Sequence, residues 1–208
     1  DLSLGTNTNI IIHSSINNHS CEVTKVQPSS VSCLTSQVSK PQSGPVYLNI
    51  SDTSYVSGYD IKGQVESRIK FTYLEPILRS IEPNFAPFTQ HAVITLKGEN
   101  LDIGYDRNVF LSEIACNVIQ FNSTLIKCVP GKYKQSESSN KNIVLYIDDA
   151  QLTLNTTEFT YLPDAAIEEV FPKFSTATSS NAISFIGKNL NSIYNPKLAI
   201  TINYEKDS

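Results

Sequence analysis

Apolar and polar residues alternate along most of this 208-residue chain, in short runs separated by turn residues. Alternation with a period of two is typical of β-strands that bury one face, and no segment keeps a helical period for longer than a turn. The segments with strand-like patterns are 9–13, 22–26, 46–50, 69–73, 92–96, 109–111, 117–121, 124–129, 143–147, 152–154 and 158–162. Strands of this length, recurring every ~8–12 positions, predict an all-β chain of sandwich domains.

Parts of this pattern recur along the chain, which indicates a tandem repeat. Two cysteine pairs share a 12-residue spacing, and two widely separated segments end on Phe-Thr-Tyr-Leu. The run at 94–101 has a counterpart at 183–190, and Pro83 has one at Pro172, each 89 residues later. Separate landmarks with one common offset are what a duplicated domain produces.

We expect the repeat to divide the chain into three parts. Residues 1–74 are predicted to form a repeat that lacks its opening strands, 75–162 a complete repeat, and 163–208 the first half of a third. This division, with a first residue other than Met, leads us to expect a piece of a longer array. The linkers around Pro76 and Pro163 are short and contain proline, so we expect stiff junctions and sandwiches arranged as a rod.

The charge and hydropathy of the chain exclude some classes of protein. The net charge is −4 and there is no basic stripe, which is unlike the electrostatic footprint of a nucleic-acid-binding domain. No apolar run approaches the ~18 residues of a membrane-spanning helix. We therefore expect no nucleic-acid partner, and a membrane attachment only through a segment outside these residues.

The four cysteines form two equally spaced pairs, Cys21 with Cys33 and Cys116 with Cys128. Zinc sites combine CxxC elements with clustered histidines, and neither is present here. We therefore predict two disulfides, each within one repeat, that close short loops and contribute ~2–4 kcal/mol apiece. Because disulfides persist in oxidising compartments, the pairs favour the secretory pathway.

Four Asn-x-Ser/Thr triplets are candidate N-glycosylation sites, at Asn18, Asn49, Asn122 and Asn155. The chain is rich in Asn, Ser and Thr, so any single triplet is weak support. Three of them lie beside predicted turns or strand ends, where a glycan projects outward. Together with the paired cysteines they favour an extracellular glycoprotein.

No catalytic constellation is present, and we expect neither enzymatic activity nor a cofactor. There is no Gly-x-Ser-x-Gly motif or phosphate-binding loop, and the three histidines make no ligand pattern. The segment 102–108 alternates acidic and amide side chains as a calcium loop does, but it lacks the bidentate glutamate. Such a segment is more often a turn, and we expect no bound metal.

Two loops have the composition of protein-binding surfaces. The loop 51–60 is rich in Tyr, Ser, Gly and Asp, in which rigid aromatic residues such as Tyr55 and Tyr59 contact a partner while small residues adapt. Its alternative interpretation is a long hairpin loop without a binding role. Tyr105 and Arg107 are of the types enriched in interface hot spots. We predict that these four residues bind a partner protein.

The order of the motifs resembles the IPT/TIG immunoglobulin-like domain. The residues that carry the resemblance are Pro76, Ile81, Pro83, the run 94–101, Cys116, Cys128, Pro130, Phe159 and Tyr161. The resemblance covers nearly the whole chain and implies tandem immunoglobulin-like sandwiches of the E-set type. Such domains form stalks in plexins and Met-like receptors. They also occur in the tiger transmembrane proteins of social amoebae, which mediate cell adhesion and self-recognition.

The bias toward Asn, Ser, Thr and Ile, and the absence of Trp and Met, favour the tiger-like branch. The resemblance then implies the extracellular segment of a cell-surface receptor that mediates cell–cell adhesion and self/non-self recognition. Its partner would be another cell-surface protein, a sibling receptor on a neighbouring cell. The alternative within the binding class is a spacer stalk of a plexin- or Met-like signalling receptor. The alternative from another class is the DNA-binding IPT domain of a transcription factor. Such domains are intracellular and bind DNA through basic loops, which this chain does not offer.

Overall fold

The structure is a computed structural model, and it describes residues 7–13, 18–52, 61–89, 92–134, 141–176, 178, 180–199 and 201. At 7–13, 18, 49–52 and 61–64 it describes the backbone alone. The regular structure of the described residues is β-strand, apart from one turn of 3-10 helix, η2 (Leu190–Ser192). The predicted all-β fold class is confirmed. No helix in these ranges has the length and apolarity needed to cross a membrane.

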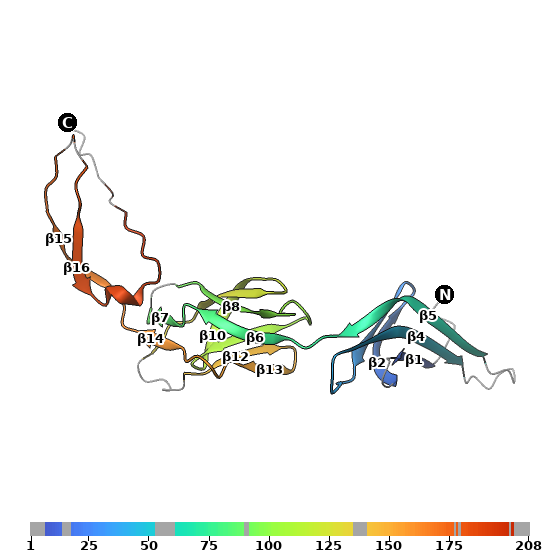
Figure 1. The fold of residues 1–208 in the computed structure, drawn as a ribbon. Helices are drawn as coiled ribbons and strands as arrows, with labels where there is room; N and C mark the ends of the chain where they lie inside the picture. The colour runs from blue at the N-terminus through green and yellow to red at the C-terminus, as the bar shows by residue number, and fades with distance from the viewer. Residues whose placement is uncertain are drawn as a thin grey trace. The chain divides into compact units, whose positions relative to one another are not determined.

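The chain forms two compact units, Asp1–Glu75 and Pro76–Ser208 (Figure 1). Their boundary falls one residue after the end predicted for the first repeat. The segment predicted to begin a third repeat belongs to the second unit. The predicted boundary between the second and third repeats, after residue 162, stays a prediction. The predicted arrangement of the sandwiches as a rod stays one as well.

The first unit is a five-stranded antiparallel sheet of order β3-β2-β1-β4-β5. Its strands are β1 (Asn7–His13), β2 (Asn18–Gln27), β3 (Ser30–Thr35), β4 (Gln42–Asp52) and β5 (Ile61–Tyr73). β5 begins at Ile61 rather than at the predicted residue 69, because it pairs along the whole length of β4. One small apolar cluster, built around Cys21, packs between these strands.

The second unit contains a seven-stranded sheet of order β13-β12-β9-β10-β11-β8-β6. Its strands are β6 (Ile77–Glu82), β8 (Ile94–Glu99), β9 (Arg107–Leu111), β10 (Ile114–Phe121), β11 (Leu125–Pro130), β12 (Ile143–Ile147) and β13 (Ala150–Thr153). Two pairs of strands complete the unit. They are the parallel pair β7 (Phe85–Pro87) with β14 (Thr160–Leu162), and the antiparallel pair β15 (Ala166–Phe171) with β16 (Ser184–Lys188).

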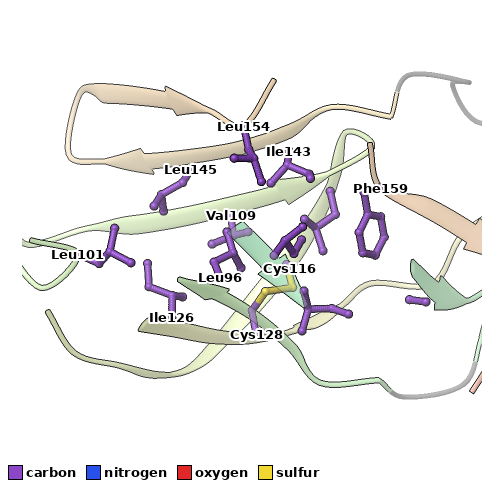
Figure 2. Close-up of a cluster of buried hydrophobic side chains, with 14 of the residues drawn as sticks. Leu96, Leu101, Val109, Cys116, Ile126, Cys128, Ile143, Leu145, Leu154 and Phe159 are labelled. Atoms are coloured by element: carbon purple, nitrogen blue, oxygen red, sulfur yellow. A yellow bond between two sulfur atoms is a disulfide. The ribbon is translucent and has the colours of Figure 1, made fainter. Parts of the chain in front are cut away.

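The core of the second unit lies between strands of the seven-stranded sheet. In Figure 2, Ile143, Leu145 and Leu154 approach from one side, and Leu96 and Ile126 approach from the other. Alternation explains why these residues face inward, since every second residue of β12 is buried. The side chains drawn there belong to one continuous apolar cluster.

A disulfide joins two adjacent strands in each unit, as the spacing predicted. Cys21 is bonded to Cys33 across β2 and β3, and Cys116 to Cys128 across β10 and β11. The Cα atoms are 5.5 Å apart in the first pair and 5.4 Å apart in the second. The second disulfide lies within the core of its unit (Figure 2).

The hairpin of β6 and β8 has a structural copy 89 residues later, in β15 and β16. Ile77 lies opposite Glu99 in the first hairpin, and Ala166 lies opposite Lys188 in the second. The pairing of each hairpin is interrupted by one bulge at the equivalent position. The 89-residue offset in the sequence is therefore an offset between equivalent backbone structures.

Gly98 is required by a close approach of two strands within the first hairpin. A Cβ atom added there would overlap the backbone carbonyl oxygen of Ile77. A clash with backbone cannot be relieved by rotating a side chain, so we expect Gly98→Ala to lower the free energy of unfolding by about 1–3 kcal/mol. Urea denaturation of the second unit measures this change.

Gly131→Ala is the matched control, because its added Cβ atom would lie 3.0 Å from a methyl group of Ile114 and 3.3 Å from the nearest backbone oxygen, without the overlap found at Gly98. We expect Gly131→Ala to lower the free energy of unfolding by less than Gly98→Ala does. Equal stability of the Gly98→Ala chain and the wild type would show that the two strands separate without cost.

Candidate partner-binding site

Tyr105 lies in the connection between β8 and β9 and is 96% exposed, the highest exposure among the large apolar and aromatic side chains described. The connection is anchored at one end by Leu101, which is fully buried in the core. At its other end Arg107 begins β9. The loop therefore holds an aromatic side chain in solvent between two fixed points.

The carboxylate of Asp148 holds the tip of this loop from the neighbouring β12–β13 turn. Its Oδ1 atom accepts hydrogen bonds from the backbone N–H groups of Tyr105 and Asp106, both at 2.9 Å. The N–H of Asp148 donates in return to the carbonyl of Asp106 at 2.9 Å. Gly104 has φ +73°, and a Cβ atom there would overlap the Asp148 carboxylate. The backbone beside Tyr105 is thus fixed by a residue distant in sequence.

The side chain of Arg107 donates hydrogen bonds to several backbone carbonyl groups of the same loop. Its guanidinium and Nε donate to the carbonyls of Leu101 at 2.9 Å, Ile103 at 2.6 Å, Gly104 at 3.2 Å and Tyr105 at 3.1 Å. The guanidinium also lies 4.0 Å from the centroid of the Phe121 ring, in cation–π geometry. These contacts give Arg107 a structural role in ordering the loop, alongside the partner contact predicted for it, which stays a prediction.

Replacing Asp148 with alanine is expected to loosen the loop. The N–H groups of Tyr105 and Asp106 lose their common acceptor, so we expect their exchange with solvent to become about tenfold faster, the equivalent of one hydrogen bond. Hydrogen exchange resolved by residue measures this rate. Asp148→Asn retains an acceptor oxygen and tolerates the φ of 49° at this position, so it should exchange nearly as the wild type does. Unchanged protection in Asp148→Ala would contradict the anchoring role.

The other predicted partner-binding residues, Tyr55 and Tyr59, lie outside the described residues. Of the four residues the structure describes Tyr105, which is 96% exposed, and Arg107, which is half-buried. Partner binding stays a prediction for all four.

The predicted glycosylation sites of the second unit, Asn122 and Asn155, are exposed. Asn122 organises the β10–β11 turn, where its Oδ1 accepts from the N–H and hydroxyl groups of Thr124 and the N–H of Leu125. These contacts use the carbonyl oxygen, whereas a glycan attaches through the amide nitrogen. In the first unit, Asn18 begins β2 and Asn49 lies within β4, and their side chains are outside the described set. Glycosylation at all four sites stays a prediction.

Acidic residues near the loop do not converge on one point. Among the described residues, no group of three or more His, Cys, Asp or Glu side chains could hold a metal ion. One oxygen of Asp148 already accepts two amide hydrogen bonds. Among the described residues, the carboxylate of Asp148 therefore serves to order the loop.

A second set of surface contacts, which the sequence pattern did not reveal, joins the segment after η2 to β6. The hydroxyl of Tyr194 donates to Glu82 at 2.7 Å, and Lys97 forms an ion pair with the same carboxylate at 2.9 Å. The Tyr194 ring also lies edge-on to Phe85, with centroids 6.5 Å apart. Nearby, Asp164 accepts from the N–H and hydroxyl groups of Thr89. These contacts hold the β15–β16 segment against the rest of its unit.

Glu82 should make this contact sensitive to acid. The hydrogen bond from Tyr194, and then the bond and charge of Lys97, hold the pKa of the Glu82 carboxyl below its ordinary value of 4.5. A carboxyl whose pKa is lowered by folding stabilises the fold above its unfolded pKa, and that stabilisation disappears as the pH falls through the folded pKa. We expect an NMR titration to show Glu82 ionising below 4.5 in the wild type. In Tyr194→Phe its pKa should rise toward the ordinary value, and an identical pKa in both chains would contradict the contact.

Comparison with known proteins identifies the fold to which this geometry belongs. Residues 76–161 match the IPT/TIG domain family. The structure is similar to the plexin A4 full extracellular region, domains 1 to 10, with a TM-score of 0.66 and 18% identity over 88% of this chain. A second structure of that region, covering domains 1 to 8, gives a TM-score of 0.53 and 16% identity over 72% of this chain.

The chain spans 15% and 14% of the length of these two plexin chains. At these identities the similarity concerns the fold alone. The match of residues 76–161 to the IPT/TIG family agrees with the resemblance that the sequence motifs between Pro76 and Tyr161 indicated. Residues 76–161 thus match the IPT/TIG domain family, and the all-β, disulfide-bonded fold of the chain is similar to that of the plexin A4 extracellular region.

Proposed function

We propose that this chain is the extracellular segment of a cell-surface receptor and acts by binding another protein rather than by catalysis. Its partner is a sibling receptor on a neighbouring cell, and the binding serves adhesion and self/non-self recognition. The observation that carries the proposal is Tyr105, which is 96% exposed on a loop ordered by Asp148 and Arg107.

An ordered loop with an exposed tyrosine is well suited to recognition. Tyrosine supplies a large contact area with few rotatable bonds, so little conformational entropy is lost when it binds. The loop backbone is already fixed by the hydrogen bonds from Tyr105 and Asp106 to Asp148, which lowers the ordering cost further.

An extracellular location is supported by three observations of different kinds. The two disulfides are of the type that persists in oxidising compartments. The exposed sequons at Asn122 and Asn155 are accessible to glycosylation. The fold similarity is to an extracellular region of a plexin.

Recognition between cells does not need a tight contact at each loop. Several receptors on two facing membranes present many copies, so weak contacts act together and the total avidity exceeds the affinity of any one. A single aromatic anchor on each copy is consistent with this mode, and it leaves room for sibling receptors to differ in the loop.

Bead aggregation tests the proposal. Beads coated with this chain are mixed with beads coated with the same chain or a sibling receptor, and clustering is counted. We expect clustering with wild-type chain and its loss with Tyr105→Ala. Val93→Ala removes a side chain that is 51% exposed elsewhere in the unit and should leave clustering intact. Clustering that persists in Tyr105→Ala would rule out this loop as the contact.

A spacer stalk is the second candidate function. It is favoured by the contacts of Tyr194 with Glu82 and of Asp164 with Thr89, because they fix one part of the second unit to another. A pure spacer holds a separate binding domain at a distance and has no affinity of its own. Beads that neither cluster nor capture any sibling receptor would favour this function over recognition.

A further inference from the structure

An exposed aromatic ring stands directly before one of the predicted glycosylation sites of the second unit. Phe121 is the last residue of β10, and the sequon Asn122-Ser123-Thr124 forms the turn to β11. Across the hairpin Phe121 lies opposite Ile126, which is fully buried in the core. Phe121 itself is 48% exposed. The end of this hairpin therefore leaves a large apolar ring half in water, beside an asparagine that can carry a glycan.

The guanidinium of Arg107 covers one face of the Phe121 ring. Its Cζ atom lies 4.0 Å from the ring centroid, in cation–π geometry. The guanidinium is held in this position, because Arg107 donates to the carbonyls of Leu101 at 2.9 Å and Ile103 at 2.6 Å. A planar ring has two faces, and covering one of them agrees with an exposure of 48%. The ring is thus fixed in orientation, with its opposite face toward solvent.

The turn holds Asn122 in one orientation as well. The backbone N–H of Asn122 donates to the carbonyl of Leu125 at 2.9 Å. Its Oδ1 accepts from the N–H groups of Thr124 and Leu125, both at 2.9 Å, and from the Thr124 hydroxyl at 3.0 Å. Because the oxygen is engaged by the turn, the amide nitrogen on the other side of Cγ projects outward, and Asn122 is exposed. A sugar attached to this nitrogen starts from a fixed point next to a fixed ring.

The chemistry of the first sugar suits an aromatic face. The first residue of an N-glycan is a β-linked N-acetylglucosamine, and the axial hydrogens of this sugar give it an apolar face of C–H groups. These hydrogens carry partial positive charge and are attracted to the negative face of an aromatic ring. The Cα atoms of adjacent residues such as Phe121 and Asn122 lie about 3.8 Å apart. That distance is shorter than an asparagine side chain with one sugar attached, so the sugar can reach the ring.

The other sequon of the second unit has no such ring beside it. Asn155 is exposed and follows Leu154, which is 5% exposed and belongs to the core. Phe159, the aromatic residue nearest to Asn155 in the sequence, is fully buried. A glycan at Asn155 therefore extends from the surface without an aromatic contact. This difference makes Asn155 a control within the same unit.

We propose that Asn122 carries an N-linked glycan whose first N-acetylglucosamine packs on the exposed face of Phe121, opposite the Arg107 guanidinium. In the attachment step a C1–N bond forms between the donor sugar and the Asn122 amide, the C1–O bond to the pyrophosphate of a lipid-linked oligosaccharide breaks, and the amide releases one proton. The packed sugar covers the apolar end of the hairpin and stabilises the β10–β11 turn. The proposal rests on the extracellular location proposed above, because N-glycans are added in the secretory pathway.

NMR of the chain secreted by eukaryotic cells, with each glycan trimmed to its first sugar, tests the contact. We expect cross-relaxation between the sugar C–H protons at Asn122 and the Phe121 ring. Because of the ring current, the same protons should resonate upfield of their equivalents at Asn155. Phe121→Tyr keeps an aromatic ring and should keep both signals, whereas Phe121→Leu should lose the upfield shift. A sugar at Asn122 of the wild-type chain without cross-relaxation to the ring would overturn the proposal.

Hydrogen exchange in β10 and β11 measures the stabilisation. The chain is made with glycans in eukaryotic cells and without them in a bacterial periplasm, with Asn155→Gln present so that Asn122 is the remaining sequon of the second unit. We expect the glycan to slow exchange in these strands roughly fivefold with Phe121, and less than twofold with Phe121→Leu. Each comparison uses one sequence, so the effect of the substitution itself cancels, and circular dichroism checks the fold. An equal effect of the glycan in both chains would overturn the proposal.

The outcomes separate this proposal from recognition at Tyr105. Bead clustering that fails while the sugar contacts Phe121 supports the sugar contact and counts against recognition alone. Loss of clustering in Phe121→Leu, with no sugar contact in the wild-type chain, would assign the ring to partner binding and overturn the sugar contact. A secreted chain with both disulfides intact and an unmodified Asn122 would overturn it as well.

Discussion

Replacing Phe159 with alanine is expected to lower the free energy of unfolding of the second unit by about 3–5 kcal/mol. The side chain is 0% exposed and is the largest of the fully buried residues described. Its ring packs edge-on against Tyr161, with centroids 5.3 Å apart. Its backbone is also fixed, since its N–H donates to the carbonyl of Lys141 at 2.9 Å. A rigidly held backbone cannot move into the space that the ring leaves. We therefore expect a loss of stability near the upper end of the range for replacing a buried Phe with Ala.

Urea denaturation followed by intrinsic tyrosine fluorescence measures this loss. Phe174→Ala is the control, because it removes the same side chain from the same unit at a site that is 89% exposed. Exposed substitutions of this kind change stability by less than about 0.5 kcal/mol. Similar midpoints for the two variants would mean that Phe159 does not lie in a packed core.

Removing the disulfide of the second unit is the other change with a large expected effect. The chain with Cys116→Ala and Cys128→Ala should lose about 2–5 kcal/mol, because the closed loop no longer restricts the unfolded state and the core loses both sulfur atoms. These cysteines are 4% and 0% exposed, so their loss also leaves space among packed neighbours. Alanine is chosen because serine would bury two hydroxyl groups.

Hydrogen exchange locates this effect within the chain. We expect lowered protection in β10 and β11 and unchanged protection in the first unit. The reciprocal variant, Cys21→Ala with Cys33→Ala, should lower protection in β2 and β3 alone. An unchanged midpoint in the second-unit variant would show that the core holds these strands together without the bond.

The features that the sequence predicted are those that depend on near neighbours. Alternation along 143–147 identified β12 and its buried face, since strand periodicity is a local property. The 12-residue spacing identified both cysteine pairs, and the bonds join neighbouring strands of one hairpin. The 89-residue offset of Gly98 and Gly187 is explained by the same close approach to a carbonyl in both hairpins.

The features that it did not predict depend on contacts between distant segments. Nothing near Asp148 in the sequence indicates that its carboxylate fixes the loop at Tyr105, which lies 43 residues away. Arginine is a residue type enriched in interface hot spots, which is why Arg107 was predicted to bind a partner. In the structure its side chain donates hydrogen bonds to four carbonyl groups of its own loop. The hydrogen bond from Tyr194 to Glu82 joins residues 112 positions apart, and the sequence near either residue does not indicate it. Side-chain roles of this kind emerge only when the strands are in place.

The central claim is that the chain consists of repeated, disulfide-bonded β domains of a secreted or cell-surface protein. Peptide mapping without reduction, on chain secreted by eukaryotic cells, tests it most directly. The account predicts linked peptides that join Cys21 to Cys33 and Cys116 to Cys128. Free thiols at these positions, or a link between the two pairs, would contradict it.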